Sequence, residues 1–219
     1  FETAELDIML QADDAEDEDP APEPSSGSPV SRVGDLWLLG PHRLLVGNSL
    51  DAESYASVTN GEPAAAMFTD PPYYVPVDGH VCGLGKIRHD EFVMASGEMS
   101  PAEFRAFLET FMIHARRALQ PGAVAFVCMD WRHIADMIGA GEARLGDLIN
   151  LCVWNKMTGG MGSLYRSQHE LVPVFRVPGA GHRNNVELGK HGRNRTNVWD
   201  HTGVQARRGE LKMHPTVKP

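Results

Sequence analysis

Apolar residues between positions 33 and 219 fall into short unbroken runs, separated by polar segments and by one long helical period. The first two runs, LWLL and RLLV, flank Gly40-Pro41 and predict a hairpin or a strand–turn–strand unit. Four later runs have the length and apolar continuity of buried strands: residues 64–69, 123–129, 148–154 and 170–177. Because Pro173 cannot donate to a strand ladder, the last of these strands is expected toward a sheet edge.

The long helical period begins at Ser100. The segment Ser100-Pro101-Ala102-Glu103 has the form of a capping box, with Pro at the first helical position. Gln120-Pro121-Gly122 ends the helix, and a second, shorter helix is expected over residues 131–138. Helices that alternate with buried strands predict an α/β fold with a largely parallel sheet. The apolar face of the long helix is expected in the core: Phe104, Phe107, Leu108, Phe111, Met112 and Ala115.

The net charge of −9 is spread unevenly along the 219 residues. Residues 1–31 contain ten acids and no Lys or Arg, whereas residues 155–219 contain eleven Lys or Arg against four acids. The acidic, Pro- and Ser-rich composition predicts a disordered linker over residues 11–32, preceded by the end of another domain at residues 1–10. The basic final third suits a polyanion, although a solvated surface explains its charge equally well.

The stretch AAAMFTDPPYY, residues 64–74, ends a predicted strand on an acid, two prolines and two tyrosines. The prolines stop the strand ladder and stiffen the corner, so the aromatic rings are expected to be held exposed. In open α/β sheets, ligands bind beyond the carboxyl ends of the strands. The corner Asp70-Pro71-Pro72-Tyr73 is therefore a candidate site, although Asp-Pro also begins many ordinary turns.

The chemistry of this corner suits a planar amine. The Asp70 carboxylate and the Pro71 carbonyl offer two acceptors to the two N–H bonds of an –NH₂ group. Tyr73 offers a flat face to an aromatic ring, a role for which Tyr74 competes. Two acceptors outside the ring plane localise the lone pair of the nitrogen, which can then attack a methyl electrophile through positioning and electrostatics alone.

This tetrapeptide resembles the catalytic motif of the amino-methyltransferases that modify DNA bases with S-adenosylmethionine. Related motifs also occur in RNA and protein-amide methyltransferases, so the tetrapeptide alone does not single out the DNA enzymes. The surrounding sequence makes the resemblance more specific. Five other segments are similar to segments of the family and follow its order: LLVGNSLD (44–51), LQPGAVAFVCMD (119–130), VWNKMTGGMGSLYRSQHELVPVFR (153–176), NVWDH (197–201) and HPTVKP (214–219).

The resemblance implies a Rossmann-like, S-adenosylmethionine-dependent methyltransferase sheet over residues 33–219, in the permuted β-type order that places the catalytic motif before the cofactor motif. The family's cofactor loop, Phe-x-Gly-x-Gly, follows a segment like HPTVKP and does not occur in this sequence. The expected fold is therefore truncated before that loop, and the fragment alone is expected to be inactive and to bind S-adenosylmethionine weakly. The resemblance places catalysis on Asp70, Pro71, Pro72 and Tyr73, and cofactor contacts on Asn48, Asp70, His214, Thr216 and Lys218.

By the same resemblance, the parent protein methylates an exocyclic amine in double-stranded DNA. The family carries Asp before Pro-Pro more often for adenine, so Asp70 favours N6-adenine. The alternatives are an N4-cytosine enzyme, an RNA or protein-amide methyltransferase and a non-catalytic DNA-binding module; for Asn48, a plain strand-end turn is an equal alternative. Basic residues of the DNA-facing segment 155–213 are candidates for phosphate contacts: Lys156, Arg166, Arg183, Lys190, Arg193, Arg195, Arg207 and Arg208.

The remaining features bound the setting. The sequence contains no run of 18 apolar residues, so no membrane span is predicted. Its three cysteines form no close pair, which fits a reducing cytoplasm. His80, Cys82 and His89 lack a fourth nearby ligand, so no metal site is expected. A role in restriction-modification is typical of the family, and a homodimer is left open. The acidic linker resembles the junction in chains that join a ParB-like domain to such a methyltransferase.

Overall fold

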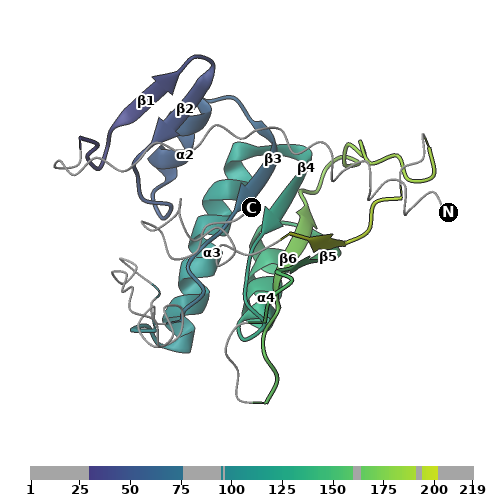
Figure 1. The fold of residues 1–219 in the computed structure, drawn as a ribbon. Coiled ribbons are helices and arrows are strands. Elements are labelled where there is room, and N and C mark those ends of the chain that lie inside the picture. The colour runs from purple at the N-terminus through teal and green to yellow at the C-terminus, as the bar shows by residue number, and fades with distance from the viewer. Residues whose placement is uncertain (1–29, 76–94, 96, 160–163, 191–193, 202–219) are drawn as a thin grey trace.

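The computed structural model describes residues 30–75, 95, 97–159, 164–190 and 194–201. Figure 1 shows how the elements follow one another, with a small hairpin and α2 preceding the main sheet. Their bounds are β1 (Leu36–Leu39), β2 (His42–Leu45), α2 (Ala52–Thr59), β3 (Ala64–Thr69), α3 (Pro101–Ala118), β4 (Leu119–Val127), α4 (Ile134–Arg144), β5 (Asp147–Asn155), β6 (His169–Arg176) and β7 (Val198–Asp200).

The main sheet has five strands in the order β3-β4-β6-β5-β7. The α/β class is confirmed, but the sheet is mixed, and the expectation of a largely parallel sheet is wrong. The pairs β3–β4 and β5–β7 are parallel, whereas β6 runs antiparallel to both β4 and β5. Helix α4 carries the chain from β4 to β5, which run in the same direction. The described part of the connection from β5 to β6 contains no helix, which suits an antiparallel return.

Pro173 lies in the central strand β6, so its expected place toward an edge is wrong. The Leu171 amide donates to the Met129 carbonyl, so the nitrogen of Pro173, two residues further on, also faces β4. The continuous β4–β6 ladder covers Val124–Phe126, and Met129 and Leu171 form a separate bridge. The pairs on both sides keep the same register, so Pro173, which has no N–H to donate, stands where this ladder is interrupted.

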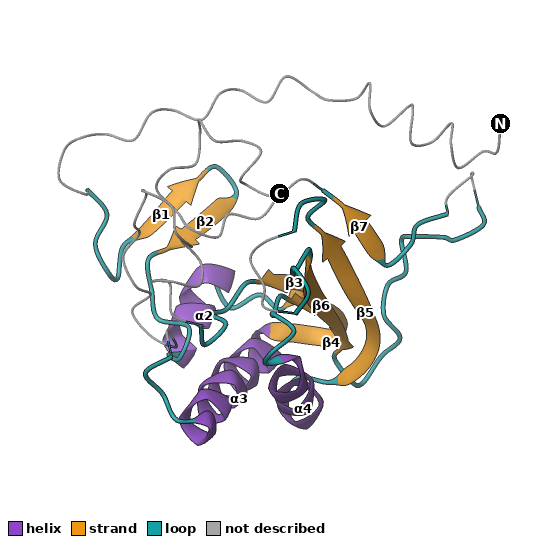
Figure 2. Cartoon of the chain, turned by 60° about the horizontal axis from the view of Figure 1, so that its bottom comes forward, coloured by secondary structure: helices purple, strands orange, loops and turns teal. Residues whose placement is uncertain are grey.

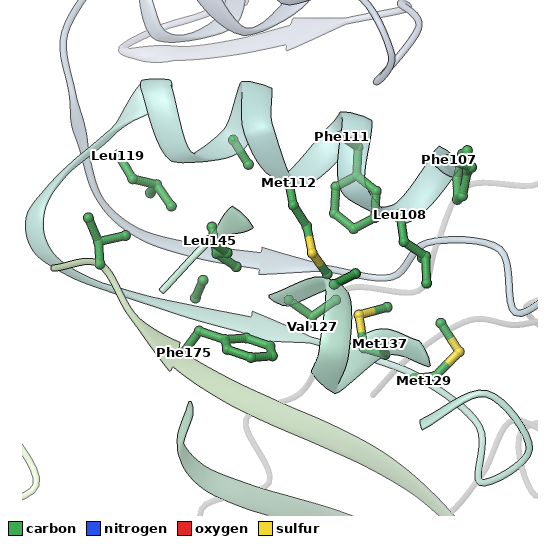
Figure 3. Close-up of a cluster of buried hydrophobic side chains, with 14 of the residues drawn as sticks. Phe107, Leu108, Phe111, Met112, Leu119, Val127, Met129, Met137, Leu145 and Phe175 are labelled. Carbon is green, nitrogen blue, oxygen red and sulfur yellow. The ribbon is translucent and has the colours of Figure 1, made fainter. Parts of the chain in front are cut away.

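Helix α3 confirms its sequence signature. Ser100 and Glu103 form both halves of the capping box, and all six predicted core residues are buried. Figure 2 shows α3 and α4 on the same face of the sheet. Side chains from both helices meet those of β4 and β6 there, among them Met112, Met137, Val127 and Phe175 (Figure 3). The helix ends at Ala118, and β4 begins directly at Leu119, so Gln120-Pro121-Gly122 belongs to the strand.

The other predicted elements are confirmed, β1 and β3 with the expected bounds and the rest with changed bounds, and two elements were not predicted. β1 and β2 form the expected antiparallel hairpin, and α4 is longer than the expected helix. Helix α2 was missed because it buries no residue and therefore has no strong apolar period. β7 was missed because it has only three residues and depends on pairing with β5. Neither of these missed elements is β3, the predicted strand that leads into Asp70-Pro71-Pro72-Tyr73.

The contact between α4 and β6 leads to a paired stability prediction. A Cβ added at Gly141 would lie 2.2 Å from Cζ of Phe175, a ring that is 0% exposed and cannot move aside. At Gly139 the nearest atom is Nη2 of Arg105 at 3.7 Å, an ordinary contact. Alanine is favoured over glycine in a helix by about 1 kcal/mol, whereas overpacking a core costs about 1–3 kcal/mol.

We therefore expect Gly139→Ala to raise the free energy of unfolding and Gly141→Ala to lower it. Urea denaturation of the two variants beside the wild type measures the order directly. If Gly141→Ala were as stable as Gly139→Ala, the close packing of α4 on Phe175 would be contradicted.

Candidate active site

Polar side chains from several elements collect at one edge of the sheet. Strands β3, β4, β5 and β7 run in the same direction and end at this edge, and β6 begins there. The edge therefore brings together residues that lie far apart in the sequence: Asp70 after β3, Asp130 after β4, Lys156 after β5, Glu170 at the start of β6 and Asp200 at the end of β7. This is the carboxyl edge at which the sequence predicted a ligand site.

The corner after β3 is built as a rigid unit. The amide of Cys128 donates to the carbonyl of Thr69 at 2.9 Å, so strand pairing continues up to Asp70. Asp70 is exposed to solvent, whereas Pro71 is buried. Tyr74 has a left-handed backbone with φ of 60°, a conformation that is costly for a non-glycine residue and needs support from packing.

That support comes from the ring of Tyr74. It stacks on Phe104 of α3 with centroids 4.9 Å apart, and its hydroxyl donates to the carbonyl of Met99. The edge of the His133 ring packs against it at 5.2 Å. Tyr74 therefore anchors the corner to the first turn of α3 and is not a second exposed face for a ligand, as the sequence had left open.

Tyr73 points to the other side of the corner. Its ring is half-buried and packs against both hydrophobic clusters of the sheet. Its hydroxyl lies 2.7 Å from Oδ1 of Asp70 and 2.8 Å from Oε2 of Glu170. Burial, followed by the negative charges of Glu170 and Asp70, raises the pKa of the Tyr73 hydroxyl far above its usual range. The expected exposed ring is thus wrong, and the hydroxyl stays protonated between two carboxyl groups.

Glu170 extends this contact to β5. Its Oε1 accepts from Nζ of Lys156 at 3.1 Å, and the same ammonium lies 5.7 Å from the ring centroid of Trp154. Glu170 lies within the family-like segment 153–176, but no local pattern in the sequence gives it a role. Its partner Tyr73 is 97 positions away, so only the antiparallel placement of β6 reveals the contact.

Among the expected cofactor residues outside the corner, only Asn48 lies in the described part of the chain. Its Oδ1 accepts from the amide of Leu50 at 3.0 Å, and its carbonyl accepts from Asp51 at 3.1 Å. Asn48 thus forms the turn between β2 and α2. His214, Thr216 and Lys218 lie outside the described residues, as do residues 11–29 of the expected linker and the residues His80, Cys82 and His89.

The basic residues expected at DNA have different environments. Lys156 is paired with Glu170, and Arg166 donates to the carbonyl of Gly159. Lys190 is 69% exposed and forms a loose ion pair with Glu187 at 3.8 Å. Arg183 and Arg195 are exposed. The remaining three, Arg193, Arg207 and Arg208, lie outside the described residues.

Trp131 is an exposed aromatic residue near this edge that sequence reasoning assigned to a helix. The helix begins only at Ile134, because Asp130 accepts from the amides of Arg132 and His133 and holds residues 131–133 in a turn. Trp131 is 52% exposed, and the guanidinium of Arg132 lies 5.0 Å from its ring centroid. Its exposure and its place after β4 are visible only in the fold.

Among the described residues, no group of three or more His, Cys, Asp or Glu side chains is arranged to hold a metal ion. No helix in the described ranges is long and apolar enough to cross a membrane. Cys128 and Cys152 are both free thiols and both buried.

A family profile described as DNA methylase matches residues 64–219, which includes the corner and the whole main sheet. A comparison with curated proteins found no match.

Solved structures of similar fold include those of three methyltransferases. A protein of Thermus thermophilus assigned as a DNA modification methylase, in complex with S-adenosyl-L-methionine, is 17% identical, with a TM-score of 0.41 and coverage of 67% of this chain and 63% of that one. M1.HpyAVI is 10% identical, with a TM-score of 0.41 and coverage of 68% and 60%. The cytosine-N4-specific PvuII DNA methyltransferase is 11% identical, with a TM-score of 0.47 and coverage of 73% and 56%. The chain thus spans less than two thirds of the length of each.

Proposed function

The chain belongs to the DNA methylase family, and on this basis we propose that the whole protein transfers a methyl group from S-adenosylmethionine to the exocyclic amine of a base in double-stranded DNA. The observation that carries the proposal is the corner Asp70-Pro71-Pro72-Tyr73. It stands at the carboxyl edge of the sheet with Asp70 exposed, and it is flanked by Thr69, which pairs with Cys128, and by Tyr74, which stacks on Phe104 of α3.

Asp70 and Pro71 act on the amine of the base. Each offers an oxygen acceptor to one N–H bond, and together they favour a pyramidal nitrogen whose lone pair points away from both. As the nitrogen forms its bond to carbon, it becomes cationic and releases one proton, which Asp70 is placed to accept. These contributions are positioning and electrostatic stabilisation, and the charged carboxylate supplies the larger part.

S-adenosylmethionine, when bound, supplies a methyl group on a sulfonium and leaves as a neutral thioether after the transfer. Among the described residues, two polar side chains are proposed to contact S-adenosylmethionine. Asn48 presents a side-chain amide at a strand end, with Oδ1 used by the turn and Nδ2 chemically able to donate to an adenine ring. Asp70 contributes a carboxylate at the carboxyl edge.

The base proposed is adenine, because Asp precedes Pro71-Pro72 as it more often does in the adenine-specific members of the family. The target must leave the duplex stack before its amine can reach Asp70, which costs a few kcal/mol. Phosphate contacts from the exposed Arg183, Lys190 and Arg195 are proposed to offset part of that cost.

The experiment that tests this function identifies the product. The whole protein is incubated with duplex DNA and S-adenosylmethionine carrying a labelled methyl group, and the DNA is digested to nucleosides. We expect label in N6-methyladenine. Label in N4-methylcytosine would correct the base, and label only in RNA or protein offered in parallel would overturn DNA as the substrate.

A further inference from the structure

Four side chains from three parts of the fold form a continuous polar chain that ends at Asp70. The Tyr73 hydroxyl lies 2.7 Å from Oδ1 of Asp70 and 2.8 Å from Oε2 of Glu170. The ammonium of Lys156 lies 3.1 Å from Oε1, the other oxygen of Glu170. The chain thus links the corner after β3 to the start of β6 and the end of β5.

The hydroxyl of Tyr73 has one proton but two carboxyl neighbours within hydrogen-bond distance. It can donate to only one ionised carboxylate at a time, so Asp70 and Glu170 compete for it. The Lys156 ammonium favours the ionised form of Glu170, whose side chain is only 14% exposed. Glu170 is therefore held as a charged competitor for the proton of Tyr73.

We propose that Glu170 is a positioning residue for the proposed methyl transfer, because it draws the hydrogen bond of Tyr73 away from Asp70 and so strengthens Asp70 as the acceptor for the amine. A carboxylate that accepts a strong hydrogen bond from a phenol shares its negative charge and is a weaker base. With the hydroxyl turned to Glu170, Asp70 keeps that charge for the N–H bond of the base. This inference rests on the proposed function and deepens it.

The arrangement also sets how the site responds to pH. Two carboxyl groups that share one hydroxyl disfavour each other's ionisation, and Lys156 opposes this effect. Directly after β4, the buried Cys128 also acts electrostatically on the Tyr73 hydroxyl. Removing the charge of Glu170 should therefore move the acid limb of the pH profile of kcat to lower pH, and removing the charge of Lys156 should move it to higher pH.

The test compares Glu170→Ala, Glu170→Gln and Lys156→Met with the wild-type whole protein. For Glu170→Ala we expect kcat to fall about ten- to a hundredfold, while KM for DNA and for S-adenosylmethionine changes little. Glu170→Gln keeps an oxygen acceptor for Tyr73, so it should restore part of kcat while keeping the shifted acid limb. Lys156→Met should shift the acid limb in the opposite direction.

Glu109→Gln is the matched control. Glu109 is also paired with cations, Arg105 and Arg144, but it lies on α3 in the helical layer. It should leave kcat and the pH profile unchanged. Circular dichroism and DNA affinity check that each variant is folded, and Glu170→Gln and Lys156→Met keep the test available if Glu170→Ala does not fold.

The outcomes separate the two claims. Wild-type protein that transfers methyl groups, together with Glu170 and Lys156 variants whose kcat and pH profiles match the wild type, would overturn this inference and leave the proposed function standing. Folded wild-type protein that transfers no methyl group to DNA would overturn the proposed function and, with it, the role of Glu170.

Discussion

Replacing Asp70 with alanine is expected to lower the rate of methyl transfer by about 10²–10⁴-fold, while DNA binding is largely retained. The variant removes the one charged acceptor of the corner and the group placed to take the proton of the amine. Asp70 is exposed, and it contributes no buried surface to the core, so the fold should survive the change. Initial rates with labelled S-adenosylmethionine and a DNA-binding isotherm on the same preparations measure both quantities.

Two further variants make this result specific. Asp70→Asn keeps an acceptor oxygen but loses the charge, and its rate should fall between those of the wild type and the alanine variant. Asp147→Asn is the control, since Asp147 also carries a carboxylate but stands at the start of β5, at the opposite edge, where it pairs with Arg176. Normal turnover in Asp70→Ala, or an equal loss in Asp147→Asn, would remove the role assigned to Asp70.

The largest expected effect on folding comes from Tyr73. Its half-buried ring packs against both hydrophobic clusters, so Tyr73→Ala should lower the free energy of unfolding by about 3 kcal/mol, the lower end of the range for truncating a fully buried aromatic ring. Tyr73→Phe keeps the ring and removes only the hydroxyl shared by Asp70 and Glu170, so its loss should be much smaller. Urea denaturation measures both variants.

Tyr165→Ala is the control for this prediction. The Tyr165 side chain is 85% exposed, so its truncation should change stability by no more than about 0.5 kcal/mol. Equal stability of Tyr73→Ala and Tyr165→Ala would mean that the Tyr73 ring is not packed as described and stands open at the corner, as the sequence alone had suggested.

The comparison of Tyr73 with Asp70 shows what the sequence could and could not predict. A buried run that ends in Asp-Pro-Pro-Tyr is a local pattern, so the position of the corner at a strand end followed from it. The direction of the two tyrosine rings did not, because it depends on partners in other elements. The ring of Tyr74 stacks on Phe104, and the hydroxyl of Tyr73 lies between Asp70 and Glu170.

The strand that contains Glu170 teaches the same lesson about topology. Its apolar run was predicted, but Pro173 suggested an edge and the alternating pattern suggested parallel pairing. In the fold, β6 is inserted antiparallel between β4 and β5. Because β6 is antiparallel, its first residues, rather than its last, lie at the carboxyl edge of the sheet. No local pattern in the sequence predicts this direction.

Helix α3, in contrast, could be predicted from its local sequence. Its cap and its buried face were both contained within one continuous segment, and both were predicted correctly. Elements whose stability depends on a distant partner, such as β7 on β5, were missed. The chemistry of the corner belongs to both classes, since Asp70 is set locally and Glu170 is set by the sheet.

The most direct measurement is a crystal structure of the whole protein with S-adenosylhomocysteine and duplex DNA that contains its methylation site. We expect the target base outside the stack, with its exocyclic nitrogen about 3 Å from an Asp70 carboxylate oxygen and from the Pro71 carbonyl. A target base bound productively elsewhere, with its amine beyond hydrogen-bond reach of both oxygens, would contradict the central claim.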